Sequence, residues 1–303
     1  MSLKEVVVAI DVGGTTIKAG LVNRENEILA RQNFSYVATN FDAEIQECVK
    51  KLIKGSKEKD LQIIGLSVGL PEYIKNHEIM SNMVVSWNSA TTQKIKELVG
   101  FELGRDQPIL IESDVRCGAI GEFSKLEKKL VSSLLYISWG TGISSTIVLP
   151  DGSCLSGLHG EALSFGEWEI DDLQGNTSTL EKVVSGSGIS EQFNNLFKKK
   201  LSALEINNEA SAGNREAQEF LVKIGSILGN EIAKFALVLD PDEIILGGGI
   251  GSSDSLMRNS AVAQYQKVYP RPKPAPVMPA RFKSDSGLLG AAIAGFNFLA
   301  GSA

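Results

Sequence analysis

Two adjacent glycines between short apolar segments constrain the fold of this chain more than any other feature. Residues 6–10 are entirely apolar, residues 19–22 form a second apolar segment, and Gly13-Gly14 lies between them. Two short strand-like segments joined through a glycine turn predict a β-hairpin. Because glycine has no Cβ, the backbone N–H groups of such a turn can approach a bulky anion such as a phosphate. The turn is therefore either a tight structural hairpin or a phosphate-binding loop.

The polar residues beside this turn extend the second interpretation. Asp11 precedes the glycines, Thr15 follows them, and Lys18 lies on the second strand. Asp11 can hold Mg²⁺ through water over a bound phosphate, because Mg²⁺ keeps much of its hydration shell. Alternatively, Asp11 shapes the turn through its own hydrogen bonds, and Lys18 is an ordinary solvated charge.

Composition excludes several classes of protein. The 303 residues suffice for one large or two ordinary domains, and 43% hydrophobic with 22% charged residues is typical of a soluble globular chain. A net charge of −6 gives no basis for binding nucleic acid or an anionic membrane, and no segment approaches the roughly 20 apolar residues of a membrane span. The start lacks the apolar core of a signal peptide. Three widely spaced cysteines predict reduced thiols in a cytoplasmic protein.

The order of apolar patterns along the chain predicts an α/β protein. Strands are expected over 27–34, 61–68, 109–111 and 243–246. Helices are expected over 42–54, 89–98, 115–123 and 214–239. An apolar, alanine-rich helix over 288–299 is expected to return to the first domain. The predicted domains are therefore a small α/β domain, 1–114 with 288–303, and a larger α/β domain, 115–287.

The opening design occurs again in the middle of the chain. An apolar strand over 133–139 runs into Gly140-Thr141-Gly142, a second strand follows, and a turn at 150–152 predicts a third. The chain thus consists of two related halves, each beginning with a three-stranded meander. Two such halves facing each other would place both glycine turns across an interdomain cleft, where a nucleotide's phosphates could be held from both sides.

A third glycine motif follows the strand expected over 243–246. Its residues are Gly247, Gly248 and Gly249. Three glycines after a buried strand indicate close approach by a ligand. The alternative is a helix N-terminus that packs tightly on the sheet.

These motifs, in this order and spacing, resemble the ROK family over nearly the whole chain. That family holds sugar kinases and sugar-responsive repressors with two actin-like (ribonuclease H-like) domains. By this resemblance, residues 11–18 and 140–142 are phosphate motifs and 247–249 is the adenosine motif. Ser113-Asp114 followed by Gly121-Glu122 resembles the element in which Asp114 would be the catalytic base. Gly166-Glu167 and Leu180-Glu181 resemble the segments that carry sugar-contacting acids.

Departures from the family pattern leave the identity of the sugar open. The family's Asn before the base is Ser113 here, and the motif His falls on Ile170, with Glu169 and His159 as possible substitutes. The usual glycine after Pro71 is Glu72. No cysteine occurs in 175–179, where most members complete a zinc site. We therefore expect no structural zinc, and the loop that carries Glu181 must be ordered in another way or be more mobile.

Phosphoryl transfer to a sugar hydroxyl needs a base, in-line alignment and donors for the transferred group. Asp114 follows a short buried strand where a helix begins; the helix N-terminus favours its ionised form, although an N-cap is the alternative. Candidate phosphate donors are the N–H groups of Gly13, Gly14, Gly140 and Gly142 with the hydroxyls of Thr15 and Thr141. Candidate sugar contacts are Asn82, Ser113, Asp114, Glu167 and Glu181. The alternatives are a solvent-facing Glu167, a helix-start Glu181 and, for Trp87 and Trp168, plain core packing.

The expected function is ATP- and Mg²⁺-dependent phosphorylation of a hydroxyl of a hexose or amino sugar, as in a glucokinase. The family resemblance also implies a homodimer. Two alternatives remain. A sugar-sensing repressor would need a DNA-binding domain, and only ten residues precede Asp11. A catalytically weakened sugar-binding member would explain the lost His and cysteines, but it has no need to retain Asp11 and Asp114.

Overall fold

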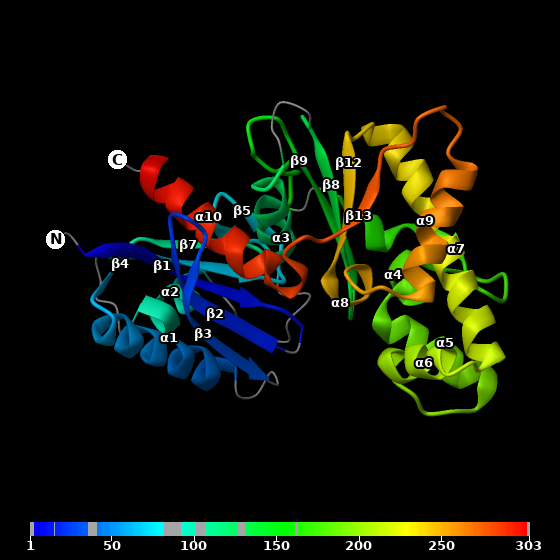
Figure 1. Ribbon diagram of the computed structural model, residues 1–303, viewed down its shortest axis with the longest axis horizontal. Helices are drawn as coiled ribbons and strands as arrows, with labels where there is room; N and C mark the ends of the chain where they lie inside the picture. The colour runs from blue at the N-terminus through cyan, green and yellow to red at the C-terminus, as the bar shows by residue number, and fades with distance from the viewer. Residues whose placement is uncertain are drawn as a thin grey trace. The chain divides into compact units, whose positions relative to one another are not determined.

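The computed structural model describes residues 3–14, 16–35, 41–81, 92–100, 107–126, 131–160 and 163–301 (Figure 1). The chain divides into two compact units. The first unit comprises Met1–Leu126, Asp151–Ala162 and Asp285–Ala303, and the second comprises Glu127–Pro150 and Leu163–Ser284. In the described part of the chain, no helix has the length and apolar character needed to cross a membrane.

The first unit is built on a five-stranded sheet in the order β3-β2-β1-β4-β7. The strands are β1 (Lys4–Val12), β2 (Thr16–Asn23), β3 (Ile28–Ser35), β4 (Leu61–Leu70) and β7 (Ile109–Ser113). The first three form an antiparallel meander, and β4 and β7 continue the sheet parallel to β1. Residues 6–10 of β1 are fully buried, since a strand covered on both faces is apolar without alternation. The predicted hairpin and its third strand are confirmed.

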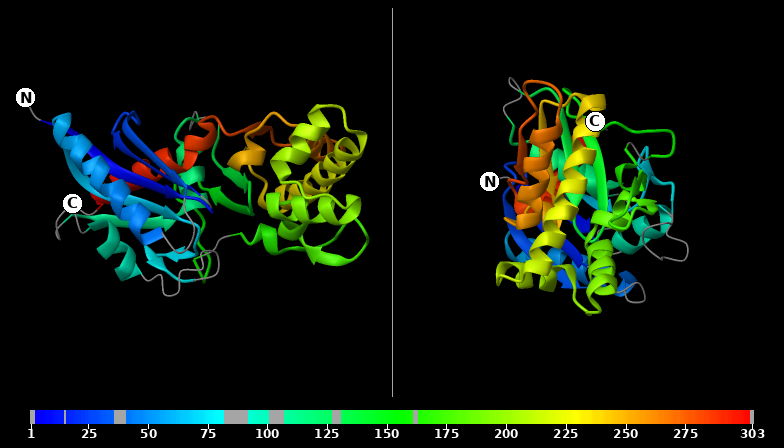
Figure 2. Two further views of the ribbon diagram at one scale, coloured as in Figure 1. Left: turned by 90° about the horizontal axis from the view of Figure 1, so that it is seen from below. Right: turned by 90° about the vertical axis from the view of Figure 1, so that its right-hand side faces the viewer.

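Helices cover both faces of this sheet. On one face lie α1 (Phe41–Glu58) and α2 (Thr92–Gly100), and on the other lie α3 (Asp114–Phe123) and α10 (Ser286–Gly301) (Figures 1 and 2). The last helix, α10, groups with the first unit. Because α3 packs along α10, residues 115–126 group with the first unit, whereas the sequence placed the boundary after residue 114.

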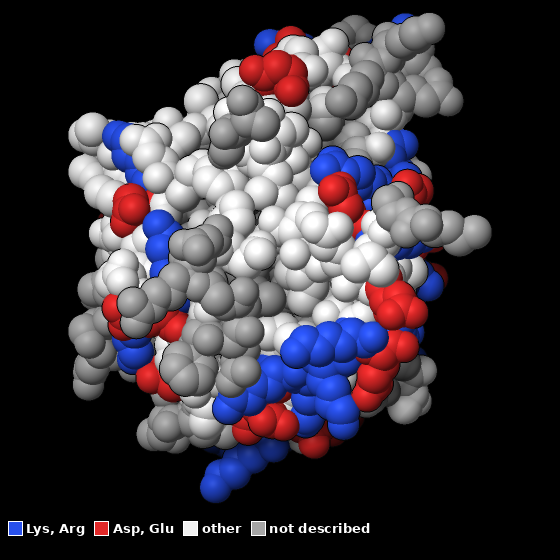
Figure 3. All heavy atoms as spheres, turned by 90° about the vertical axis from the view of Figure 1, so that its left-hand side faces the viewer, with Lys and Arg blue, Asp and Glu red and all other residues white. Residues whose placement is uncertain are grey.

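Helix α1 buries one face and exposes the other, which accounts for its amphipathic sequence. Ile45, Cys48 and Leu52 form part of its buried stripe, as the spacing predicts. Its outer face carries lysines interspersed with acids, including the pair Lys51–Glu47 at 3.5 Å. Basic side chains gather along the lower edge of the face drawn in Figure 3, with acidic side chains among them. Such a mixed surface matches the absence of a basic excess in the sequence.

The second unit is built on a four-stranded sheet in the order β13-β12-β8-β9. The strands are β8 (Leu134–Trp139), β9 (Ile143–Val148), β12 (Glu243–Gly247) and β13 (Val277–Pro279). One core joins the sheet to α4 (Leu180–Val184), α5 (Gly186–Phe197), α6 (Ala203–Ser211), α7 (Arg215–Leu239) and α9 (Leu256–Val268). Figure 1 labels these helices beside the sheet. Helix α7 has the bounds that the sequence predicts to within one residue, and it ends before Asp240-Pro241.

The third strand predicted after the turn at 150–152 is wrong. No strand forms among the described residues 151–160, and Ser145 on β9 makes a single bridge with Leu163 instead. Residues 151–162 belong to the first unit, where Lys75 Nζ donates a hydrogen bond to the Leu158 carbonyl at 2.8 Å. The meander is therefore complete in the first half and shortened to two strands in the second.

A hairpin orders the segment where the family resemblance led us to look for zinc cysteines. Strands β10 (Glu169–Asp171) and β11 (Thr177–Thr179) pair with each other, and β11 leads directly into α4. Asp172 Oδ1 closes the turn by accepting hydrogen bonds from the N–H groups of Gln174 and Asn176 at 2.8 and 2.9 Å. Ile170, at the position of the family His, packs against the core of this unit. Hairpin pairing and core packing thus order this loop.

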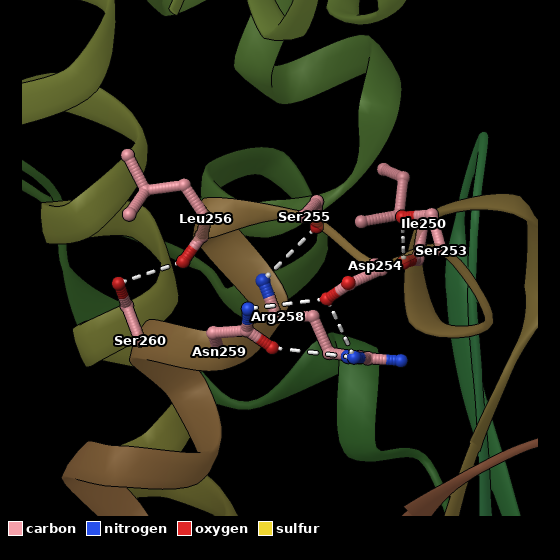
Figure 4. A network of polar contacts seen from close by, with 8 residues as sticks. All are labelled: Ile250, Ser253, Asp254, Ser255, Leu256, Arg258, Asn259 and Ser260. Atoms are coloured by element: carbon pink, nitrogen blue, oxygen red, sulfur yellow. Dashed lines mark hydrogen bonds and ion pairs between the residues drawn. The ribbon is translucent and has the colours of Figure 1, made fainter. Parts of the chain in front are cut away.

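The chain that leaves the triple-glycine motif is fixed by side-chain hydrogen bonds. After the one-turn helix α8 (Gly248–Gly251), Ser255 caps α9 by accepting a hydrogen bond from the Arg258 N–H at 3.2 Å. The Arg258 guanidinium lies between Asp254 and Asn259 and donates to both, at 3.1 and 3.2 Å (Figure 4). These contacts fix the connection between α8 and α9.

Candidate active site

Three acids lie at or just after the ends of three neighbouring parallel strands of the first unit. Asp11 near the end of β1 is level with Gly69 on β4, and Leu70 on β4 is level with Ser113 on β7. Glu72 comes two residues after β4, and Asp114 comes directly after β7. The carboxyl ends of parallel strands meet at one edge of a sheet, and this is where α/β proteins bind ligands.

Asp114 is a carboxylic acid with an unusual protonation equilibrium. It is the first residue of α3 and accepts a hydrogen bond from the Val115 N–H at 2.7 Å, whereas Ser113 occupies the N-cap position. Burial raises the pKa of Asp114 to about 8, and the charges of Asp11 and Glu72 add to this effect. The backbone hydrogen bond opposes the shift but is outweighed. The helix N-terminus therefore does not keep this acid ionised, contrary to our expectation from the sequence.

Asp11 lies opposite Lys18 in the β1–β2 hairpin. Burial raises the pKa of Asp11 to about 6; the charge of Lys18 lowers it, and that of Asp285 raises it. A Cβ on Gly287, near the start of α10, would stand only 2.6 Å from the Asp11 carboxylate. Asp11 is therefore held between its own hairpin and the first turn of the last helix.

Sequence reasoning missed Asp285 as a site residue. Its Oδ2 accepts a hydrogen bond from Arg31 at 2.6 Å, and its Oδ1 is buried without a hydrogen bond among the described residues. Asp285 ends the short helix η2 (Lys283–Asp285), more than 250 residues after Asp11, so no local pattern links the two. The only available signal was its place three residues before the alanine-rich helix expected over 288–299.

The carboxylates of Asp11 and Asp285 are suitable ligands for Mg²⁺. Mg²⁺ binds oxygen donors and typically takes one or two carboxylates together with waters and phosphate oxygens. A buried carboxylate oxygen without a partner, as at Asp285, fits such a donor set. Among the described residues, no group of three or more His, Cys, Asp or Glu is arranged to hold a metal by itself. Any metal here would depend on water and phosphate for its remaining ligands.

The first glycine turn has less free hydrogen-bonding capacity than its sequence indicates. The Gly13 N–H already donates to the Thr16 carbonyl at 2.9 Å. Gly14 is exposed, faces open space, and its N–H makes no hydrogen bond within the described part of the chain. Thr15, Asn82 and Trp87 lie outside the described residues.

The second glycine turn, in the second unit, shows the same arrangement. The Gly140 N–H donates to the Gly142 carbonyl at 2.9 Å, so the Gly13 and Gly140 N–H groups, both predicted phosphate donors, each have an acceptor within their own turn. The Gly140 carbonyl accepts from the Gly186 N–H at 2.8 Å, which ties the turn to the start of α5. The N–H groups of Thr141 and Gly142 make no hydrogen bond among the described residues.

The triple-glycine motif serves packing at two of its three positions. A Cβ on Gly247 would overlap the Tyr136 side chain. Gly248 has φ +73°, and a Cβ there would lie 2.5 Å from the Trp139 carbonyl oxygen. Only Gly249 faces open space, and its nitrogen lies 3.5 Å from the Cβ position of Gly140. Tight packing on the sheet therefore accounts for the first two glycines, and the third adjoins the Gly140–Gly142 turn.

The two predicted sugar-contacting acids, Glu181 and Glu167, come from segments that approach Ile143, the residue after the Gly140–Gly142 turn. Glu181 Oε2 accepts a hydrogen bond from the Ile143 N–H at 3.0 Å. Glu167 ends the short helix η1 (Phe165–Glu167), and a Cβ on Gly166 would meet the Ile143 carbonyl at 2.6 Å. Both acids are exposed. Glu169 and His159, the possible substitutes for the lost His, are also exposed. Glu169 lies on β10, and His159 lies in the first unit.

Trp168 packs within the second unit. Its ring meets those of Phe165 and Phe235 edge to face, with centroids 5.7 and 5.1 Å apart. The core interpretation of this tryptophan is therefore confirmed.

Comparison with known proteins identifies the class of protein to which this α/β architecture, with its acids at the strand ends, belongs. The family described as the ROK family matches residues 7–295. The chain belongs to the ROK family.

Relatives of similar length differ in their named sugars. A glucokinase from Halalkalibacterium halodurans is 26% identical over 93% of this chain and 92% of its own length. An N-acetyl-D-glucosamine kinase from Haemophilus influenzae is 25% identical, with 93% and 97% covered. An N-acetylmannosamine kinase from Salmonella typhi is 22% identical, with 94% and 96% covered.

Solved structures confirm the fold. A ROK family glucokinase from Streptomyces griseus, in complex with glucose and AMPPNP, superposes with a TM-score of 0.80 at 21% identity, over 96% of this chain and 99% of that one. A ROK hexokinase from Thermus thermophilus superposes with a TM-score of 0.77 at 20% identity, over 98% and 99%. The predicted actin-like α/β fold with two domains is therefore confirmed.

Proposed function

We propose that this chain is an ATP-dependent kinase that phosphorylates a hydroxyl of a hexose or amino sugar. The observation that carries the proposal is Asp114, a carboxyl group at the strand-end edge beside Asp11, in a chain of the ROK family. Relatives of nearly the same length are named as kinases of glucose, N-acetylglucosamine and N-acetylmannosamine. Their diversity supports the reaction type and leaves the sugar open.

In this proposal Asp114 accepts the proton of the attacking sugar hydroxyl. A general base works best when its pKa lies near the operating pH, and the pKa of Asp114 in the free protein is about 8. The hydrogen bond from the Val115 N–H orients the carboxylate. Asn82, Ser113, Glu167 and Glu181 are the proposed sugar contacts, because carboxylates, amides and hydroxyls recognise sugar hydroxyls.

The phosphates of ATP would take backbone donors that have no hydrogen-bond partner among the described residues. These donors are the N–H groups of Gly14, Thr141 and Gly142. The open space at Gly249 would let a phosphate approach the backbone there. The hydroxyls of Thr15 and Thr141 and the side chain of Lys18 are further proposed phosphate contacts. Asp11, through water, and Asp285 would hold Mg²⁺. When bound, this ion would neutralise phosphate charge. A cytoplasmic homodimer is proposed from the wide spacing of the cysteines and from the family resemblance.

A coupled assay of ADP release tests the proposal. Wild-type protein with ATP and Mg²⁺ is offered hexoses, N-acetylhexosamines, hexosamines and their epimers. Turnover with at least one sugar supports a sugar kinase, and a rate equal to the sugar-free rate with every sugar refutes it. Asp114→Asn should abolish turnover and leave nucleotide binding nearly unchanged. Asp42→Asn, on the exposed face of α1, is the matched control and should keep full activity.

A further inference from the structure

Arg31 and Asp285 form an ion pair that joins β3 to the start of the last helix of the first unit. The Arg31 Nη2 donates a hydrogen bond to Asp285 Oδ2 at 2.6 Å, although the two residues are 254 positions apart. Their side chains are 36% and 28% exposed. A partly exposed pair of this kind adds at most about 1 kcal/mol to stability, so the orientation that it fixes matters more than its energy.

The strand residue Gly20 opens the route of the Arg31 side chain to Asp285. Gly20 on β2 is directly opposite Arg31 on β3, and residues directly opposite in an antiparallel pair project from the same face of the sheet. A Cβ on Gly20 would lie 3.5 Å from Leu288 Cδ2, which identifies this face as the one covered by α10. Because Gly20 has no side chain, β2 leaves space at this position for Arg31 to reach the start of α10.

The two carboxylate oxygens of Asp285 have different environments. Oδ2 is bonded to Arg31, whereas Oδ1 is buried and has no hydrogen bond among the described residues. Asp285 lies two residues before Gly287, whose Cβ position is 2.6 Å from the Asp11 carboxylate, and the charge of Asp285 acts on Asp11. The guanidinium thus fixes one oxygen of Asp285 and leaves the other as a buried acceptor near Asp11.

We propose that Arg31 is a positioning residue that orients Asp285 to bind the Mg²⁺ of the nucleotide complex beside Asp11. The proposal rests on the nucleotide- and Mg²⁺-binding part of the proposed function. A group that holds a metal-binding carboxylate by a hydrogen bond fixes its orientation and raises its affinity for the metal. The positive charge of Arg31 by itself would weaken the binding of a cation. Orientation and charge therefore predict opposite effects when Arg31 is replaced.

The test measures how strongly Mg²⁺ supports nucleotide binding. Calorimetry gives the Kd of AMPPNP with excess EDTA and with excess Mg²⁺, and the ratio of the two is the gain in affinity due to the metal. We expect Arg31→Gln to lower this ratio by about tenfold, because Asp285 is no longer oriented. Arg31→Lys keeps the charge and a donor but loses the planar fork, so its ratio should fall between those of Arg31→Gln and the wild type.

Two further variants show whether Arg31 acts through Asp285. Asp285→Asn should lower the ratio by itself, and adding Arg31→Gln should then change it by less than about twofold, because the two residues are coupled. Arg24→Gln is the matched control, since the Arg24 Nε donates to Glu5 Oε2 at 3.1 Å just after the end of β2. It should leave the ratio unchanged, and an equal fall in this variant would overturn the proposal as a general effect of surface charge.

The outcomes separate this proposal from the proposed function. A ratio in Arg31→Gln that equals or exceeds that of the wild type overturns the role of Arg31, as do fully additive effects of Arg31→Gln and Asp285→Asn. A wild-type ratio near one also overturns it, because the protein would then not hold the metal. If Arg31→Gln does not fold, Arg31→Lys decides, and an unchanged ratio there overturns the role. A wild type that binds AMPPNP with Mg²⁺ but phosphorylates no sugar refutes the kinase and leaves the role of Arg31 intact.

Discussion

Glu181 Oε2 accepts a hydrogen bond from the backbone N–H of Ile143 at 3.0 Å. Ile143 directly follows the Gly140–Gly142 turn, and a Cβ on Gly142 would stand 2.8 Å from the same oxygen. The carboxylate thus shapes the second glycine turn from outside it. A residue that the sequence offered as a sugar contact has a structural contact as well.

Removing this acceptor should destabilise the protein. We expect Glu181→Ala to lower the free energy of unfolding by about 1 kcal/mol, because the Ile143 N–H loses its partner. Glu181→Gln keeps an acceptor oxygen and should recover most of the loss. Urea denaturation measures both, with Glu191→Ala, exposed on α5, as the control. Equal stability of the alanine variant and wild type would contradict a role in shaping the turn.

The buried Asp114 carboxyl predicts an unusual dependence of stability on pH. Its pKa is raised from 3.8 to about 8 in the folded state, so the folded state binds the proton more tightly than the unfolded state. The contribution of Asp114 to stability therefore falls as pH rises from about 4 to about 8 and is constant above that range. A pKa difference of one to two units between the folded and unfolded states already changes the free energy of unfolding by roughly 1.4–3 kcal/mol.

Asp114→Asn cannot ionise and should relieve this cost. We expect its melting temperature to exceed that of the wild type at about pH 9 and the gain to vanish near pH 4. Thermal unfolding in EDTA, without nucleotide, measures it, and Asp42→Asn should show no such trend. A gain that is the same at both pH values would show that Asp114 does not titrate as proposed.

The same pKa predicts the pH profile of the proposed reaction. A general base must be ionised, so kcat/KM should fall as pH decreases through the pKa of Asp114 in the free protein, about 8. Below that pKa, log kcat/KM should decrease by about one for each pH unit. Initial rates in overlapping buffers, with MgATP and sugar both well below their KM values, give the profile of the free protein. A flat profile from about pH 5 to 9 would remove Asp114 from the role of base.

Features that depend on local pattern could be predicted from the sequence. The β1–β2 hairpin follows from two apolar segments around Gly13-Gly14, and α7 follows from a helical stripe that ends before a proline. The position of Asp114 at the junction of β7 and α3 could be predicted for the same reason. Each of these needs only neighbours within a few residues.

Contacts between distant segments could not be predicted. Asp285 comes near Asp11 only because α10 packs back on the first sheet, and no periodicity encodes that approach. The contact of Glu181 with Ile143 likewise joins residues that are 38 positions apart. The three glycines 247–249 look alike in the sequence but occur for different structural reasons. Gly247 and Gly248 are required by packing against β8, whereas the Cβ position of Gly249 faces open space.

The crossing of α3 and α10 gives a sharp test of packing in the first unit. Gly290 on α10 stands so close to α3 that an added Cβ would overlap the Cys117 carbonyl. We expect Gly290→Ala to lower the free energy of unfolding by about 3 kcal/mol, because backbone on both helices must move. Gly55→Ala in α1 is the control, since nothing lies within 4 Å of its Cβ position.

At Gly55 the same substitution should raise stability by up to about 1 kcal/mol through helix propensity. Chemical denaturation of both variants measures the two opposite signs under identical conditions. If Gly290→Ala were as stable as Gly55→Ala, the two helices would not approach as closely as described. The close packing of α3 on α10 matters for the proposed site, because α3 begins with Asp114 and α10 begins beside Asp11. A shift of either helix should therefore also reduce kcat/KM in the kinase assay.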